Sequence, residues 1–351
     1  MRNKMYIAII LASAIICSCS VDDCIPYRVE DGRCILNVEI DTECNPGSRS
    51  AGTGTETQAY ESAVNDIQIF IYDSFGQIEA YCRTGGSTGL VQVSTTSGPK
   101  TVWAVINGPD MSMSTQAATA EGISRTCTIL DDNSIADGFV MAGCAECTIS
   151  ESGESVSVPV RRFVSRIVLK RISSMLPPGY GPLIIKNVFL ANVAGSQEIS
   201  GSASTEIWYN QAGRTESATD ASMIIGMDGN QASCPELTFK DAGYEIPYGD
   251  SFYPGTPLYC YPNHSSSDTA GWTMPYTGRK TRLIVSAEIS GIDCYYPVTI
   301  DFPERNTAYT VEITITGPGS TDPDIPVARG NASVAISLQD WRSGAEYSET
   351  I

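Results

Sequence analysis

The sequence contains a single histidine, His264, among its 351 residues. A Ser-His-Asp triad or a Cys-His pair has only this imidazole available, and the neighbouring Asn263 and serines are typical of a loop. The sequence has no Walker loop and no GxGxxG motif. Residues 131–133 (Asp-Asp-Asn) lack the ligand spacing of an EF-hand, because Ile135 interrupts it. We therefore expect no catalytic residues, no metal and no cofactor, and we expect that the protein is not an enzyme.

Basic residues are scarce. The chain has 22 Lys and Arg against 40 Asp and Glu, which gives a formal net charge of −18. Nucleic-acid binding needs Lys and Arg patches that neutralise phosphates. The composition therefore predicts no nucleic-acid partner, and the acidic excess is expected to lie on a solvated outer surface.

Helical periodicity is also rare, and residues 115–124 form one of the few candidate helices. Short stretches with period-2 alternation, separated by Gly, Pro and Asn, run through the rest of the chain. They occur at residues 67–73, 77–81, 100–107, 139–142, 156–160, 161–170, 184–193, 258–261, 282–290, 295–302, 310–316 and 332–341. The length suffices for two separate cores. The pattern predicts an all-β fold of two β-sandwiches with a boundary near residue 160, and a long polar insertion at residues 195–256.

The N-terminus has the features of an export signal over residues 1–18. Two positive charges precede an apolar run, residues 6–16, that is too short to remain as a membrane-spanning helix. Ile16-Cys17-Ser18-Cys19 resembles a bacterial lipobox, so we expect cleavage before Cys19 and its acylation, with palmitate among the lipids. The precursor would then be anchored to the outer membrane without spanning it. An ordinary signal peptide that is cut nearby is the alternative.

Export implies an oxidising compartment, in which disulfides persist. Ten cysteines remain once Cys17 has left with the signal and Cys19 has taken the lipid, and an even number permits five disulfides of unknown connectivity. Cys144 and Cys147 have CxxC spacing, without the strand-to-helix context of a redox motif and without a second pair for zinc. We expect a structural disulfide between them.

Residues 19–49 are a predicted pro-segment. Residues 34–40 alternate as a strand does, and a polar, glycine-rich stretch follows at residues 45–57, where Arg49 is the only basic residue. Proteases cut exposed loops of this composition. The pattern favours a processing site in this stretch.

Six motifs, in order, resemble those of the FimA-type fimbrillins of the Bacteroidales, which are subunits of surface fimbriae. The motifs lie at residues 100–107, 161–172, 258–263, 295–298, 304–306 (Glu-Arg-Asn) and 314–319 with Trp341. The resemblance covers most of residues 30–345. It implies two transthyretin-like Greek-key sandwiches in tandem, over residues 50–160 and 161–351, and a structural subunit of a fimbrium that mediates adhesion and biofilm formation.

The resemblance also implies how the subunit assembles. An arginine-specific protease would cut between Arg49 and Ser50, and release of residues 19–49 would leave an apolar groove in the first sandwich. The C-terminal segment of another subunit would enter that groove as a strand. The donor residues of this chain would be Ala345, Tyr347 and Ile351. The implied partners are other fimbrial subunits, the outer membrane through the lipid, and a host or bacterial surface ligand.

Several alternatives stay open at this stage. The donor segment is interrupted by Glu349, which would suit a tip subunit. Cleavage after Arg49 divides the ten cysteines into three and seven, so either each part keeps a free thiol or one disulfide crosses the cut. A crossing disulfide would favour a lipid-retained anchor. A surface glycan-binding lipoprotein, with its site in residues 195–256, is a hypothesis of a different class.

Overall fold

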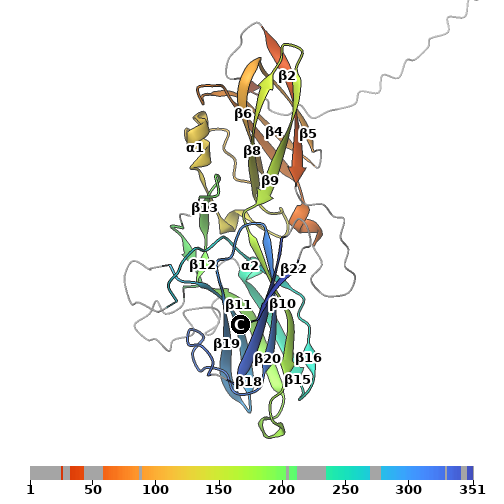
Figure 1. The fold of residues 1–351 in the computed structure, drawn as a ribbon, viewed down its shortest axis with the longest axis vertical. Coiled ribbons are helices and arrows are strands. Elements are labelled where there is room, and N and C mark those ends of the chain that lie inside the picture. Colours follow the sequence, from red (N-terminus) through yellow and green to blue (C-terminus); the bar gives the residue numbers. More distant parts are fainter. Residues whose placement is uncertain are drawn as a thin grey trace, which may run out of the picture.

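A computed structural model describes residues 25–26, 32–42, 58–86, 89–202, 205–211, 235–268, 278–328, 330–340 and 346–350. The chain forms two β-sandwiches stacked end to end along the long axis of the molecule (Figure 1). The predicted all-β class is confirmed. Helices are short, as in α1 (Ala120–Ser124) and α2 (Pro235–Thr238). Within the described ranges, no helix has the length and apolar character needed to cross a membrane.

The first sandwich is a single sheet of eight strands folded into two layers, in the order β1-β4-β3-β6-β8-β9-β2-β5. The strands of one layer are β1 (Ile25–Pro26), β4 (Ile78–Gly85), β3 (Asp66–Tyr72), β6 (Gly98–Ile106) and β8 (Met141–Ile149); those of the other are β9 (Glu154–Arg162), β2 (Arg33–Thr42) and β5 (Leu90–Thr96). The layers join at a corner, where Met141 pairs with Arg162 and Ala142 with Arg161. Buried aliphatic side chains of both layers form one core between them.

The second sandwich has a separate sheet in each layer. One sheet contains β16 (Ser251–Phe252), β10 (Ser165–Ser174), β20 (Thr307–Ile315), β21 (Ala332–Asp340) and β22 (Glu346–Thr350), with β17 (Pro257–Cys260) also paired to β10. The other contains β15 (Phe239–Ile246), β11 (Leu183–Ala191), β18 (Thr281–Ile289) and β19 (Ile292–Ile300). The alternating residues Val311, Ile313 and Ile315 of β20 are buried in the core between these sheets, as their period-2 pattern predicts.

One pair of short strands links the two parts of the chain: β7 (Cys127–Ile129), which follows α1, pairs with β13 (Ser196–Glu198). Another pair, β12 (Val193–Ala194) with β14 (Trp208–Tyr209), lies wholly within the second part. The predicted helix at residues 115–124 is confirmed as a 3-10 turn, η2 (Gln116–Ala118), followed by α1.

The stretch 195–256, predicted to be a polar insertion, contains several short elements in its described part. These are β13, β14, α2, β15 and β16, and β15 extends a sheet of the second sandwich by pairing with β11. Strand β15 lies at the sheet edge, and Ile246 is its one buried residue. An edge strand that buries so little carries no period-2 signal in its sequence.

The predicted disulfide between Cys144 and Cys147 is wrong, because both thiols are free. Both cysteines lie in β8, where three residues of extended chain span about 10 Å. Disulfides need Cα atoms about 4.4–6.8 Å apart. Among the described residues, Cys34, Cys127, Cys144, Cys147, Cys260 and Cys294 have free thiols, and Cys82 is disulfide-bonded.

Candidate strand-assembly site

Strand β2, which contains the predicted strand at residues 34–40, lies inside the sheet of the first sandwich. Its residues alternate strictly between the two faces. Leu36 and Val38 are fully buried and Ile40 is 8 % exposed, whereas Ile35, on the opposite face, is 49 % exposed. Apolar side chains facing inward at every second position account for the packing of β2 against the opposite layer.

Both edges of β2 are paired. It runs antiparallel to β5, with Val38 opposite Val91, and parallel to β9, with Val38 also opposite Val156. A chain that lost β2 would leave unpaired backbone groups on two strands and an apolar slot between them. Exposed strand edges of this kind readily pair with another chain.

One wall of this slot, β5, is held independently of β2. Glu79 on β4 accepts hydrogen bonds from Lys100 Nζ on β6 at 2.6 Å, from Thr95 Oγ1 at 2.8 Å and from the Thr96 amide at 2.6 Å, both on β5. Burial alone would raise the pKa of Glu79, but these hydrogen bonds outweigh it and lower the pKa from 4.5 to about 2. The carboxylate therefore joins β5 to the opposite layer without using any atom of β2.

A buried polar network holds the chain that follows the predicted processing loop. Glu61 lies in a 3-10 turn, η1 (Ala59–Ser62), and is completely buried. Its carboxylate accepts from Arg166 Nε at 2.8 Å and from the Tyr259 hydroxyl at 2.5 Å, and Tyr60 contacts the same hydroxyl at 3.0 Å. Burial, followed by the negative charge of Glu61, raises the pKa of Tyr259. Because β10 and β17 supply Arg166 and Tyr259, the network fixes this segment to the second sandwich.

The Glu304-Arg305-Asn306 motif lies at the same junction. The Arg305 guanidinium stacks over the Phe163 ring, 4.3 Å from its centroid, and donates to the Arg161 carbonyl at 2.8 Å. Burial, followed by the nearby Arg161 charge, lowers the pKa of Arg305 to about 10. Asn306 has a positive φ of 56° and accepts from Arg162 Nη1 at 3.1 Å. The motif thus positions the end of β9 against the second sandwich.

The chain is similar over nearly its whole length to the major fimbrium subunit FimA type-2 of Porphyromonas gingivalis. The two are 23 % identical over 404 aligned residues, which cover 97 % of this chain and 98 % of that protein. A solved fimbrilin from Porphyromonas gingivalis superposes with a TM-score of 0.60 at 13 % identity, covering 88 % of this chain and 97 % of that one. The chain has the fimbrillin fold. The tip fimbrial protein of the same organism, with a C-terminal truncation, superposes with a TM-score of 0.52 at 12 % identity, covering 88 % of this chain and all of that one. No protein-family model matches the chain.

The fimbrillin resemblance predicted from the six motifs is confirmed by these similarities. Five of the predicted site residues lie outside the described ranges: Cys19, Arg49, Ser50, Ala345 and Ile351. Tyr347 lies in β22, where it pairs with Leu338 of β21. In this fimbrillin fold the C-terminal strand is thus added to the edge of its own second sandwich.

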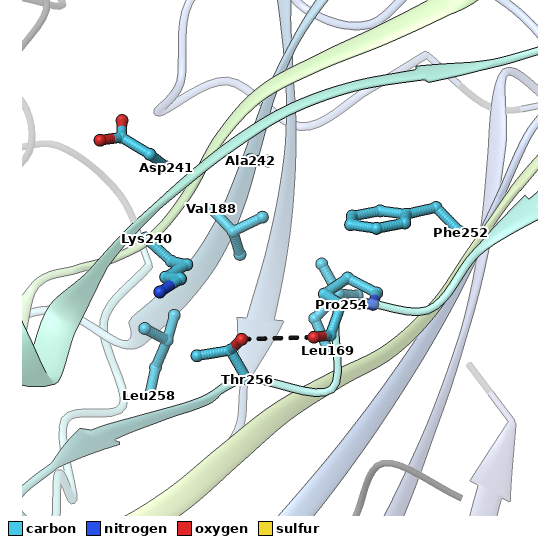
Figure 2. Close-up of a pocket in the computed structure, with 9 residues that line it drawn as sticks. All are labelled: Leu169, Val188, Lys240, Asp241, Ala242, Phe252, Pro254, Thr256 and Leu258. Atoms are coloured by element: carbon cyan, nitrogen blue, oxygen red, sulfur yellow. Dashed lines mark hydrogen bonds between the residues drawn. The ribbon is translucent and has the colours of Figure 1, made fainter.

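Two features of this fimbrillin fold were missed at the sequence level. The Glu61 network is spread over residues far apart in sequence, and a buried glutamate has no local signature. A cavity of about 190 Å³ opens between the layers of the second sandwich (Figure 2). Leu169, Val188 and Phe252 line it, and Thr256 donates to the Pro254 carbonyl at 3.2 Å. Its lining is mostly apolar, with Lys240 and Asp241 contributing charge.

Proposed function

We propose that the chain is a structural subunit of a bacterial surface fimbrium that mediates adhesion and biofilm formation. It is exported as a lipoprotein acylated at Cys19, is trimmed between Arg49 and Ser50, and joins other fimbrial subunits by strand addition. Its precursor is held at the outer membrane by the lipid, and the assembled protein is at the cell surface.

The observation that carries this proposal is the position of β2. This strand precedes Arg49 in sequence, yet it fills the slot between β5 and β9 with Leu36, Val38 and Ile40 buried. Burying three such side chains stabilises a fold by about 5–9 kcal/mol in total. A trimmed subunit therefore has a strong drive to bind a replacement strand with apolar residues at alternate positions.

The buried Glu61 supports trimming at the loop. Residues 43–57 separate β2 from Gln58, whose amide donates to Glu61 at 2.9 Å. A cut at Arg49 would free the chain before this point, and the Glu61–Arg166 pair would hold the chain after it. The two sides of the cut are thus bound to different parts of the molecule.

The test is to digest the purified precursor with an arginine-specific protease and to measure assembly by light scattering and electron microscopy. We expect N-terminal sequencing to give Ser50, and polymers to form from trimmed protein once the released segment has been removed. Arg49→Ala should abolish both results. Arg125→Ala is a matched control, because this exposed arginine lies outside the loop and is paired with Glu121.

Two outcomes would overturn the proposal. Trimmed protein with an emptied slot could remain monomeric in the presence of other subunits. Alternatively, cells carrying Arg49→Ala could display fimbriae at the wild-type level.

A further inference from the structure

The cavity between the layers of the second sandwich lies at one side of that sandwich, where both of its sheets end. Strand β15 is the edge strand of one sheet, and β16 and β17 lie along the edge of the other, where both pair with β10. Residues 253–256, between β16 and β17, form no strand. The two sheet edges are therefore not closed against each other here, and a space of about 190 Å³ remains (Figure 2).

The inner walls of this cavity are apolar. Leu169 of β10, Val188 of β11 and Leu258 of β17 line it and are at most 4 % exposed. Phe252 of β16 also lines it, and its ring stacks on Tyr244 of β15, with the ring centroids 4.0 Å apart. This ring contact joins the two edge strands beside the cavity. An apolar protein cavity of about 150 Å³ holds benzene, so the space here suffices for one ring or one branched aliphatic group.

The strand register places one positive charge at the cavity. Lys240 of β15 lies opposite Val188, and directly opposed residues of antiparallel strands share a face of the sheet, so the Lys240 side chain leaves β15 on the cavity side. Asp241 lies opposite Asn187 on the other face, and Figure 2 shows its carboxylate directed away from the other lining side chains. Within the described ranges Lys240 makes no ion pair. Its ammonium group is therefore available to an anion at the cavity.

We infer that this cavity binds a small monocarboxylic acid, with its ring or branched chain between the sheets and its carboxylate at the Lys240 ammonium group. A sugar fits these walls poorly, because its buried hydroxyl groups would lack hydrogen-bond partners. The Thr256 hydroxyl already donates to the Pro254 carbonyl. A cationic ligand would be repelled by Lys240. The site lies in the second sandwich, so it depends neither on trimming nor on strand addition.

The two parts of the ligand contribute differently to binding. Lys240 is exposed, so an ion pair with it stays in contact with water and adds little affinity. Most of the affinity comes from removing the apolar group from water. The charge instead sets the preference among ligands of equal size. An acid should bind more tightly than the matching alcohol, and the alcohol more tightly than the matching amine.

Three probes with the same ring and nearly the same length test this preference: phenylacetate, phenethyl alcohol and phenethylamine. Each is titrated into the full-length chain by isothermal titration calorimetry and followed by ligand-observed NMR. We expect saturable binding of phenylacetate, weaker binding of the alcohol and the weakest binding of the amine. Absence of saturable phenylacetate binding would overturn the inference, and so would equal affinities for all three probes.

Substitutions at the cavity separate its size from its charge. Ala242 is a half-buried lining residue on β15, and Ala242→Phe should fill the space and abolish binding of phenylacetate and of the alcohol alike. Lys240→Gln should weaken phenylacetate binding by about two- to fivefold and leave alcohol binding unchanged. Lys186→Gln is the matched control, because Lys186 is on the neighbouring strand β11 and already pairs with Glu288 at 2.9 Å.

Circular dichroism checks that each variant folds, and Lys240→Gln, at an exposed position, remains decisive if Ala242→Phe does not fold. Equal loss of phenylacetate binding in Lys240→Gln and Lys186→Gln would show that Lys240 has no specific role. Unchanged binding in a folded Ala242→Phe protein would place the ligand elsewhere. Either result would refute the inference and leave the proposed role in a fimbrium untouched.

Discussion

The Nε atom of Arg166, at the start of the second sandwich, lies 2.8 Å from a carboxylate oxygen of Glu61, the first buried residue after the predicted processing loop. Arg166 is 3 % exposed and Glu61 is fully buried. A buried pair of this kind is expensive to desolvate, and removing one partner leaves a charge without compensation. The pair therefore couples the stability of the segment that leads into β3 of the first sandwich to that of the second sandwich.

Replacing Arg166 tests that dependence. We expect Arg166→Ala to lower the free energy of unfolding by about 3–5 kcal/mol, because the buried Glu61 carboxylate would lose its cationic partner. Arg125→Ala removes an exposed ion pair with Glu121 and should change the free energy of unfolding by less than about 1 kcal/mol. Urea denaturation followed by tryptophan fluorescence gives both values. Equal effects of the two substitutions would show that the buried pair has no special role.

Two adjacent residues of β2 test how that strand is held. Leu36→Ala should lower the free energy of unfolding by about 2–5 kcal/mol, since it leaves a cavity in the core of the first sandwich. Ile35→Ala, on the half-exposed face of the same strand, should change the stability by about 0.5 kcal/mol or less. The comparison uses urea denaturation of the untrimmed precursor. Similar losses for both variants would mean that β2 is not packed through its inward face.

Acid should weaken the link between β5 and the opposite layer. The pKa of Glu79 is lowered to about 2, so its stabilising contribution is complete above an unfolded pKa near 4.5 and is lost as the pH falls toward 2. Glu79→Gln should reduce the loss of stability between pH 4.5 and pH 2 by on the order of 2 kcal/mol. Glu39→Gln, on the exposed face of β2, is the control. An unchanged acid transition in Glu79→Gln would contradict this account.

A subunit without residues 342–351 distinguishes two roles in assembly, because it should still accept a strand but should no longer donate one. Strand β22 adds to the edge of β21, and the buried Ile336 of β21 remains when β22 is deleted. We therefore expect the truncated protein to fold and, after trimming and removal of residues 19–49, to bind intact subunits without extending the polymer. Length distributions in electron micrographs should shorten as the truncated protein is added. Polymers built from truncated protein alone would show that another segment is the donor.

The sequence revealed most of the strands, because a strand that buries one face alternates visibly, as in β2 and β20. It failed where this signal is weak or misleading. Strand β15 buries only Ile246 among its residues, so its alternation is invisible. The spacing of Cys144 and Cys147 suggested a bond that a fully extended strand forbids. The Glu61 network joins residues about a hundred and two hundred positions apart, and only the fold brings them together.

The direction of β2 has a consequence for the geometry of a fibre. Strand β2 runs parallel to β9, which ends at the junction with the second sandwich, so β2 begins at the far tip of the molecule (Figure 1). A C-terminal strand that replaces β2 with the same pairings must enter from that tip, and its own subunit must lie beyond it. Successive subunits would then stack head to tail along their long axes, which gives the fibre a polarity and confines growth by this route to its ends.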